Sequence, residues 1–171
     1  MKKVVITFGL LSGAMAAVMM FATLPFVERI GFDRSIVVGY TTIVISMLFV
    51  YFGVRSYRDN VLGGRLTFGD GFKAGLAITA ISSACYVAAW LVLFYGFMPD
   101  FVDRYTAYVV DSARASGASE AVIASKIKET EDARKLLENP LTNAAVSFLE
   151  PFPVGLLVTL ISAAVLRRRS P

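Results

Sequence analysis

The sequence contains no histidine and a single cysteine, Cys85, which lies inside an apolar run. One cysteine cannot form a disulfide within the chain, and a chain without histidine lacks the Cys/His sets that hold zinc. The apolar segments also lack paired carboxylates, so the usual acid–base sets of enzymes are missing. We therefore expect no metal, no cofactor and no enzymatic activity.

Charge is scarce as well, since charged residues make up 18% of the chain against roughly 25% in soluble proteins. Hydrophobic residues reach 56%, above the roughly 45–50% of a soluble domain. The formal net charge is +4, but the positive side chains lie beside apolar runs, where they orient a membrane protein rather than bind phosphates. This composition predicts an integral protein of the lipid bilayer with no nucleic-acid partner.

Four apolar segments are long enough to cross a bilayer, which takes about 20 helical residues. They cover residues 4–27, 36–54, 74–98 and 141–166. None shows the alternation of a barrel strand, so we expect an all-α, polytopic membrane protein with one four-helix membrane domain over residues 1–171. The first segment runs past the roughly 7–15 apolar residues of a signal peptide, and we expect it to remain as an anchor.

The positive residues predict the orientation of these spans. They lie at three places: before span one, between spans two and three, and after span four. These residues are Lys2 and Lys3; Arg55, Arg58, Arg65 and Lys73; and Arg167, Arg168 and Arg169. In the loop after span one, Arg29 and Arg34 are balanced by Glu28 and Asp33. The positive side faces the cytoplasm in membrane proteins, so both termini are expected there.

The only long polar segment, residues 99–139, lies between spans three and four and is expected on the extracytoplasmic side. Tyr105 and Tyr108 fall on one apolar-aromatic face of a first helix, and residues 116–118 break it. Ser119 is placed to cap a second helix, which Asn139 and the proline after it end. We interpret the insert as a helical hairpin that rests its aromatic face on the membrane surface or on the span ends. The alternative is a solvated pair of helices that only links two spans.

Small residues recur four apart in three of the spans, where they allow helix backbones to approach closely. The glycines in these rows are Gly9, Gly13, Gly71, Gly75 and Gly155. They are expected to hold the bundle together, and a homo-oligomer interface is the competing use. Thr67 and Asp70 have the spacing of a capping box at the start of span three. Helix initiation alone therefore explains why these two residues occur there.

Glu150 is the ionisable residue that most invites a functional interpretation. Counting back from Arg167 at about 1.5 Å per residue places it roughly 24 Å from the cytoplasmic boundary. Pro151 and Pro153 remove backbone donors, so we predict a break in span four with the carboxylate facing the bundle. The neighbours expected to complete this polar membrane site are Ser82, Ser83, Tyr86, Arg29 and Arg34. The alternative is a carboxylate in the headgroup zone, or one paired structurally with an arginine.

Several motifs together resemble an uncharacterised family of bacterial four-span inner-membrane proteins, catalogued only as a domain of unknown function. They are Phe-Gly-x-Gly-Phe-Lys-x-Gly from Phe68 to Gly75, Tyr86 and Trp90 in span three, and Glu-x-x-Pro-Val-Gly-Leu from Glu150, followed by an apolar run and arginines. The resemblance covers nearly the whole chain. It implies a four-helix domain with a helical insert, located in the bacterial inner membrane, and it implies no activity.

Two functions follow from these observations as hypotheses. The first is a non-enzymatic membrane protein that binds a protein or lipid partner through the insert, because polar groups are too scarce in the spans for a permeation path. The second is a small oligomeric transporter or ion-coupled carrier that uses Glu150 at the broken helix.

Overall fold

The computed structural model describes residues 1–168, apart from the side chain of Glu28. Arg169, which entered the charge count above, lies outside the described residues. The elements are α1 (Lys2–Thr23), the short 3-10 helix η1 (Leu24–Phe26), α2 (Val27–Ile30), α3 (Phe32–Asn60), α4 (Phe68–Gly96), α5 (Phe101–Ala115), α6 (Glu120–Glu138), α7 (Pro140–Phe148) and α8 (Pro151–Leu166). The expected all-α fold is confirmed.

Four helical stretches within the described residues are long and apolar enough to cross a membrane. They are Lys2–Phe26, Phe32–Asn60, Phe68–Gly96 and Pro140–Leu166. The chain is therefore a multi-pass membrane protein by helix length and composition. The second span is longer than the apolar segment 36–54 because the helix continues through charged residues at both ends. Those residues lie outside the apolar run that defined the segment.

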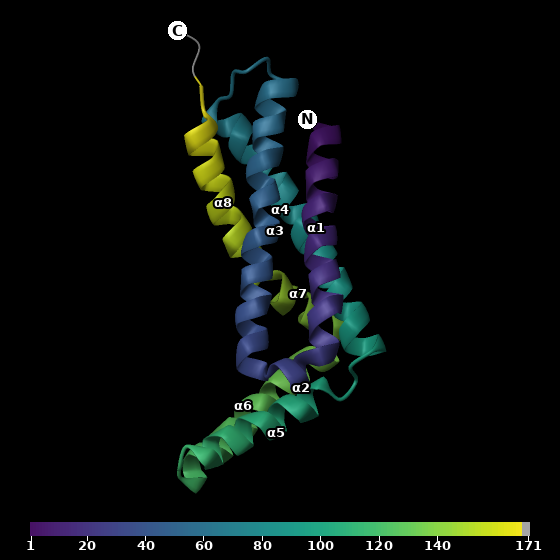
Figure 1. Cartoon of the computed structure of the whole chain (residues 1–171), viewed down its shortest axis with the longest axis vertical. Coiled ribbons are helices and arrows are strands. Elements are labelled where there is room, and N and C mark those ends of the chain that lie inside the picture. Colours follow the sequence, from purple (N-terminus) through teal and green to yellow (C-terminus); the bar gives the residue numbers. More distant parts are fainter. Residues whose placement is uncertain (169–171) are drawn as a thin grey trace.

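The long helices run side by side in an elongated bundle, with the start of α1 and the end of α8 at one end (Figure 1). We call this the terminal end, and the opposite end, where α5 and α6 lie, the hairpin end. Both α1 and α8 pack against α3 and α4. The α5–α6 pair lies between spans three and four in sequence and projects away from the bundle (Figure 1).

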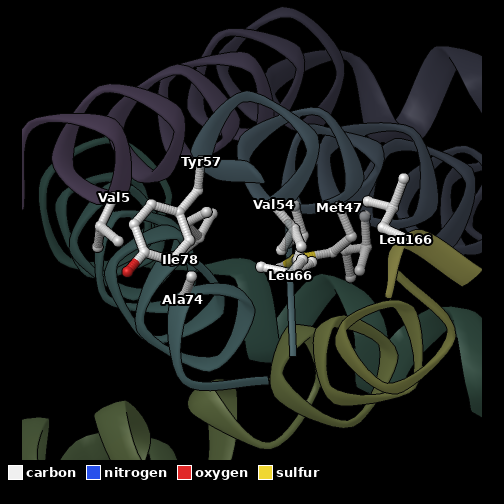
Figure 2. Close-up of a cluster of buried hydrophobic side chains, with 10 residues drawn as sticks. Val5, Met47, Val54, Tyr57, Leu66, Ala74, Ile78 and Leu166 are labelled. Carbon is white, nitrogen blue, oxygen red and sulfur yellow. The ribbon is translucent and has the colours of Figure 1, made fainter. Parts of the chain in front are cut away.

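The apolar core lies toward the terminal end, and all four spans contribute to it (Figure 2). Its buried members are Val5, Ile43, Met47, Val50, Val54, Tyr57, Leu66, Ala74, Ile78 and Leu166. Large apolar side chains elsewhere on the spans remain exposed, as Val18, Leu157 and Val165 do. A surface of this kind suits contact with lipid chains.

The small-residue rows lie where helices meet inside the bundle. A Cβ added at Gly13 would lie 2.3 Å from the Cys85 Cβ, and one added at Gly9 would lie 2.8 Å from the Ile81 Cβ, so α1 approaches α4 closely. Between α4 and α8, a Cβ at Gly75 would lie 2.8 Å from Thr159 Cγ2. Gly71 and Gly155 lie on the same α4–α8 contact. Such short approaches leave no room for larger side chains.

Buried hydroxyl groups join the same helices. The Ser12 hydroxyl donates to the Ser46 carbonyl at 2.7 Å and lies 2.7 Å from the Ser82 hydroxyl, so it links α1 to α3 and α4. The hydroxyl oxygens of Thr79 and Thr159 lie 3.1 Å apart between α4 and α8. These contacts pair polar groups that would otherwise be buried without a partner.

The α5–α6 hairpin turns between Ala115 and Glu120 as expected, with Gly117 at a positive φ of 75°. Ser119 is the N-cap residue of α6, but its side chain forms no capping hydrogen bond, so this detail of the prediction was wrong. The turn is exposed, and water can satisfy the first N–H groups there. Asp103 of α5 and Arg134 of α6 form an ion pair that joins the two helices, and the contact raises the pKa of Arg134.

The aromatic face of α5 packs on the span ends. The ring of Phe32, the first residue of α3, stacks on Tyr108 with centroids 4.9 Å apart and meets Tyr105 edge-on at 5.6 Å. Val27 and Met98 complete this cluster. The expectation that both tyrosines turn toward the span ends is confirmed, so this face is used inside the chain.

Candidate functional site

Span four breaks at Glu150, between α7 and α8. The α8 helix begins at Pro151, as predicted, but Glu150 itself keeps right-handed helical angles, with φ −75° and ψ −59°. A residue before proline usually leaves helical geometry, but Glu150 does not. The break follows from hydrogen bonding: the N–H groups of Leu149 and Glu150 bond to carbonyls three residues back, at 3.0 and 3.4 Å. Pro151 and Pro153 then offer no N–H to continue the ladder.

The Glu150 carboxylate meets a side chain of the bundle, because the Tyr86 hydroxyl of α4 donates to Oε2 at 2.7 Å. At about 1.5 Å per residue, Tyr86 lies roughly 20 Å along α4 from Lys73, and Glu150 lies roughly 24 Å from the end of α8. A bilayer has about 30 Å of hydrocarbon. The pair therefore lies between the ends of the spans, in the half of the bundle nearer the hairpin, and we expect it at membrane depth.

A cavity of about 360 Å³ adjoins this pair at the hairpin end. Its wall is mostly apolar and includes Met20, Leu24, Val27, Phe32, Ile36, Tyr40, Ile43, Tyr86, Trp90, Phe101, Val102, Tyr105, Leu137 and Val146. Among the described residues, Glu150 is the carboxylic acid in this lining, and no arginine or lysine contributes to it. The hairpin closes the cavity through Phe101, Val102 and Tyr105 from α5 and Thr130 and Leu137 from α6.

The cavity opens at the side of the bundle, between α3 and α7. Ala16 and Met20, which line it from α1, are buried. By contrast, Tyr40 of α3 is 56% exposed and Val146 of α7 is 42% exposed, although both line the same space. The opening exists because α8 packs on α3 and α4, whereas α7, beyond the break, packs on α4 and α6. Glu150 is exposed at this opening.

Asn143 of α7 fixes one wall of the cavity. Its side chain is fully buried; its oxygen accepts from Trp90 Nε1 at 2.8 Å, and its NH₂ group donates to the Leu137 carbonyl at 3.2 Å. The Tyr95 hydroxyl donates to the same carbonyl at 2.6 Å. This network ties α4, α6 and α7 together. Asn143 was not among the residues expected at the site, although an amide in an apolar span is a signal of its own.

Two of the three α4 residues expected near Glu150 are elsewhere. Ser82 is buried against Ser12, and Ser83 is buried with no hydrogen-bond partner for its hydroxyl among the described residues. Both predictions were wrong because the short serine side chains lie about a turn deeper than Tyr86, where neighbouring helices close on α4. Only Tyr86 has the length and position to reach the carboxylate.

Arg29 and Arg34 were also expected to supply charge to Glu150, and this was wrong. Both side chains are exposed at the hairpin end, and no ion pair joins either one to Glu150 in the part of the chain that the structure describes.

A second hollow, of about 480 Å³, lies at the terminal end. Its polar lining includes Arg65, Arg167, Arg168, Thr67 and Asp70. The Thr67 hydroxyl accepts from the Asp70 N–H at 3.1 Å, which confirms the predicted helix cap. The antiparallel bridge between Leu66 and Arg168 holds the loop against the end of α8. The charged lining suits the membrane surface, so the apolar cavity is the stronger candidate for a ligand site.

The chain belongs to the family described as "Protein of unknown function (DUF4199)", whose model matches residues 7–168. The resemblance drawn from the sequence motifs is thereby confirmed. The chain matches no curated protein and no solved structure.

Proposed function

We propose that this DUF4199 chain is a non-enzymatic protein of the bacterial inner membrane that binds a lipid-like amphipathic molecule in the cavity beneath its hairpin. The supporting observation is the cavity of about 360 Å³, which is mostly apolar, lies between the ends of the spans and opens at the side of the bundle between α3 and α7. Ligand pockets commonly measure about 300–1,000 Å³ and combine apolar walls with a few polar groups. The Glu150–Tyr86 pair is such a polar group here.

The size of the cavity fits a chain rather than a whole phospholipid. At a liquid volume of roughly 30 Å³ for each water-sized group, about 360 Å³ holds on the order of a dozen such groups. A single alkyl chain of about a dozen carbon atoms fits this volume and can enter through the side opening, where Glu150 lies. Burial of a methylene group is worth about 0.8 kcal/mol when the group comes from water, and much less when the chain enters from lipid.

The hairpin acts in this proposal as a wall of the cavity. Its aromatic face already packs on Phe32, and Phe101 and Tyr105 also face the cavity. A separate protein partner would have to use the remaining, charged surface of α5 and α6. The distribution of lysine and arginine supports a cytoplasmic location for both termini, which places the hairpin outside.

A small ion-coupled carrier is the second candidate, and the observation that favours it is a carboxylate at a helix break within span four. A carrier needs an exit on the other side. Toward the terminal end, the Ser12–Ser82 contact and the apolar core close the bundle. Binding without transport is therefore the better-supported function, and a failure of vesicles to accumulate a bound amphiphile would distinguish the two.

Trp90 makes a direct test possible. It is the only tryptophan in the chain and it lines the cavity. We expect dodecanol brominated on its chain, titrated into vesicles that contain the protein, to quench Trp90 fluorescence in a saturable manner, because bromine quenches at contact.

Gly39 provides a matched pair of variants with Gly96. Gly39 lines the cavity, and a Cβ added to either glycine would have no neighbour within 4 Å. Gly39→Leu should remove the saturable quenching by occupying the space, while Gly96→Leu should leave it unchanged. Equal quenching in both folded variants would show that the alkyl chain does not enter the cavity.

A further inference from the structure

We infer that the cavity selects amphiphiles with a cationic headgroup, such as an ammonium, which the Glu150 carboxylate receives beside Tyr86. This inference deepens the proposed function and rests on it. It is drawn from the position of the carboxylate, its incomplete hydrogen bonding, the absence of a nearby cation and the aromatic rings around it.

The carboxylate of Glu150 has capacity left for a ligand. Among the described residues, Tyr86 is its only side-chain hydrogen-bond donor, and that bond engages Oε2. The second oxygen, Oε1, has no donor in the same part of the chain. A carboxylate accepts at both oxygens, so a headgroup with N–H or N–CH₃ groups can approach Oε1 while Tyr86 stays in place.

No positive side chain of the described residues balances this carboxylate. Arg29 and Arg34 are exposed at the hairpin end, and the cavity lining contains neither arginine nor lysine. An acidic group at this depth, roughly 20 Å along α4 from Lys73 and nearer the hairpin end, is costly as an anion without a counter-charge. A cationic ligand supplies that charge at the place where the chain lacks it.

The aromatic lining favours the same ligand class. Tyr40 and Trp90, from α3 and α4, line the cavity together with Tyr86. The faces of such rings attract ammonium groups, most strongly where water is excluded. A phospholipid headgroup fits less well, because its phosphate would meet the Glu150 carboxylate, and because the surrounding headgroup layer lies farther out, at the hairpin.

The test compares two brominated probes of equal chain length, a dodecyl trimethylammonium ion and dodecanol, by quenching of Trp90 in neutral vesicles. The parent protein should bind the ammonium probe more tightly than the alcohol. Glu150→Gln should weaken binding of the ammonium probe on the order of tenfold, the effect of losing one interaction with a charged group, and leave dodecanol binding nearly unchanged. Glu138→Gln, which removes an exposed carboxylate at the end of α6, is the matched control and should behave like the parent.

A conservative variant separates charge from folding. Glu150→Asp should retain the preference for the ammonium probe, whereas Glu150→Gln should lose it, and unquenched Trp90 emission reports whether each variant keeps its fold. If Glu150→Gln leaves the preference intact, the headgroup assignment is wrong, even where Gly39→Leu still blocks dodecanol. If Gly39→Leu has no effect on either probe, the proposed cavity site itself is wrong.

Discussion

Gly13 offers the sharpest test of how the bundle is held together. A Cβ added there would lie 2.3 Å from the Cβ of Cys85 and 2.9 Å from its Sγ. Carbon atoms in contact prefer about 3.5–4.0 Å, so Gly13→Ala requires α1 and α4 to separate by on the order of 1 Å. Overpacking of this kind costs about 1–3 kcal/mol. We expect a loss of stability in that range.

The comparison with Gly39→Ala removes the effect of helix propensity. Both substitutions replace a helical glycine by alanine, which by itself favours the helix by roughly 0.5–1 kcal/mol. At Gly39 the added Cβ has no neighbour within 4 Å, so only the favourable effect remains. Reversible unfolding in mixed micelles, with Trp90 emission as the probe, should therefore show Gly13→Ala below the parent and Gly39→Ala at or above it.

A double variant tests the cause of the loss. Cys85→Gly removes the Cβ and Sγ that the new methyl group would meet, so it should cost less stability in the Gly13→Ala background than in the parent. Residues in direct contact show coupling energies of about 0.5–3 kcal/mol, and we expect a coupling that favours the double variant. Equal stabilities of Gly13→Ala and Gly39→Ala, with no coupling to Cys85→Gly, would refute the close approach of α1 and α4.

Two further predictions concern the cavity wall and the orientation. Asn143→Ala should destabilise the protein by about 1–3 kcal/mol and change the emission of Trp90, whose N–H would lose its buried acceptor; a melting curve and spectrum like those of the parent would contradict the network. In a Cys85→Ser background, a cysteine at Ser116 should react with a membrane-impermeant thiol reagent in intact cells, while one at Ser56 should not. The reverse pattern would overturn the orientation inferred from the positive residues.

Much of the fold could be predicted because its signals are local. The spans are continuous apolar runs, and the hairpin turn at residues 116–119 contains a glycine that takes a positive φ. The Tyr86–Glu150 contact could also be predicted, because two prolines mark the break and the helical rise gives the position of each residue along its helix. These inferences need only the chain's own periodicity and the thickness of a bilayer.

The features that were missed depend on how distant helices meet. Ser82 and Tyr86 lie four residues apart on one face of α4, but one meets Ser12 and the other meets Glu150. Depth along the helix decides between these neighbours, and the spacing alone does not show where the bundle closes. The buried amide of Asn143 likewise bonds to groups far away in sequence. A local sequence pattern does not identify partners that are distant in sequence.

The cavity itself follows from the break in span four, which connects the two parts of the proposed site. An unbroken span four would continue along α3 and α4 to the hairpin end and fill the space in which the cavity lies. Because Pro151 and Pro153 interrupt the helix, α7 packs mainly on α4 and α6 within the described residues, whereas α8 packs on α3 and α4. The same interruption places Glu150 at the opening, beside Tyr86. The prolines thus account for both the apolar space and the acidic group at its entrance, which is why a single amphipathic ligand fits both.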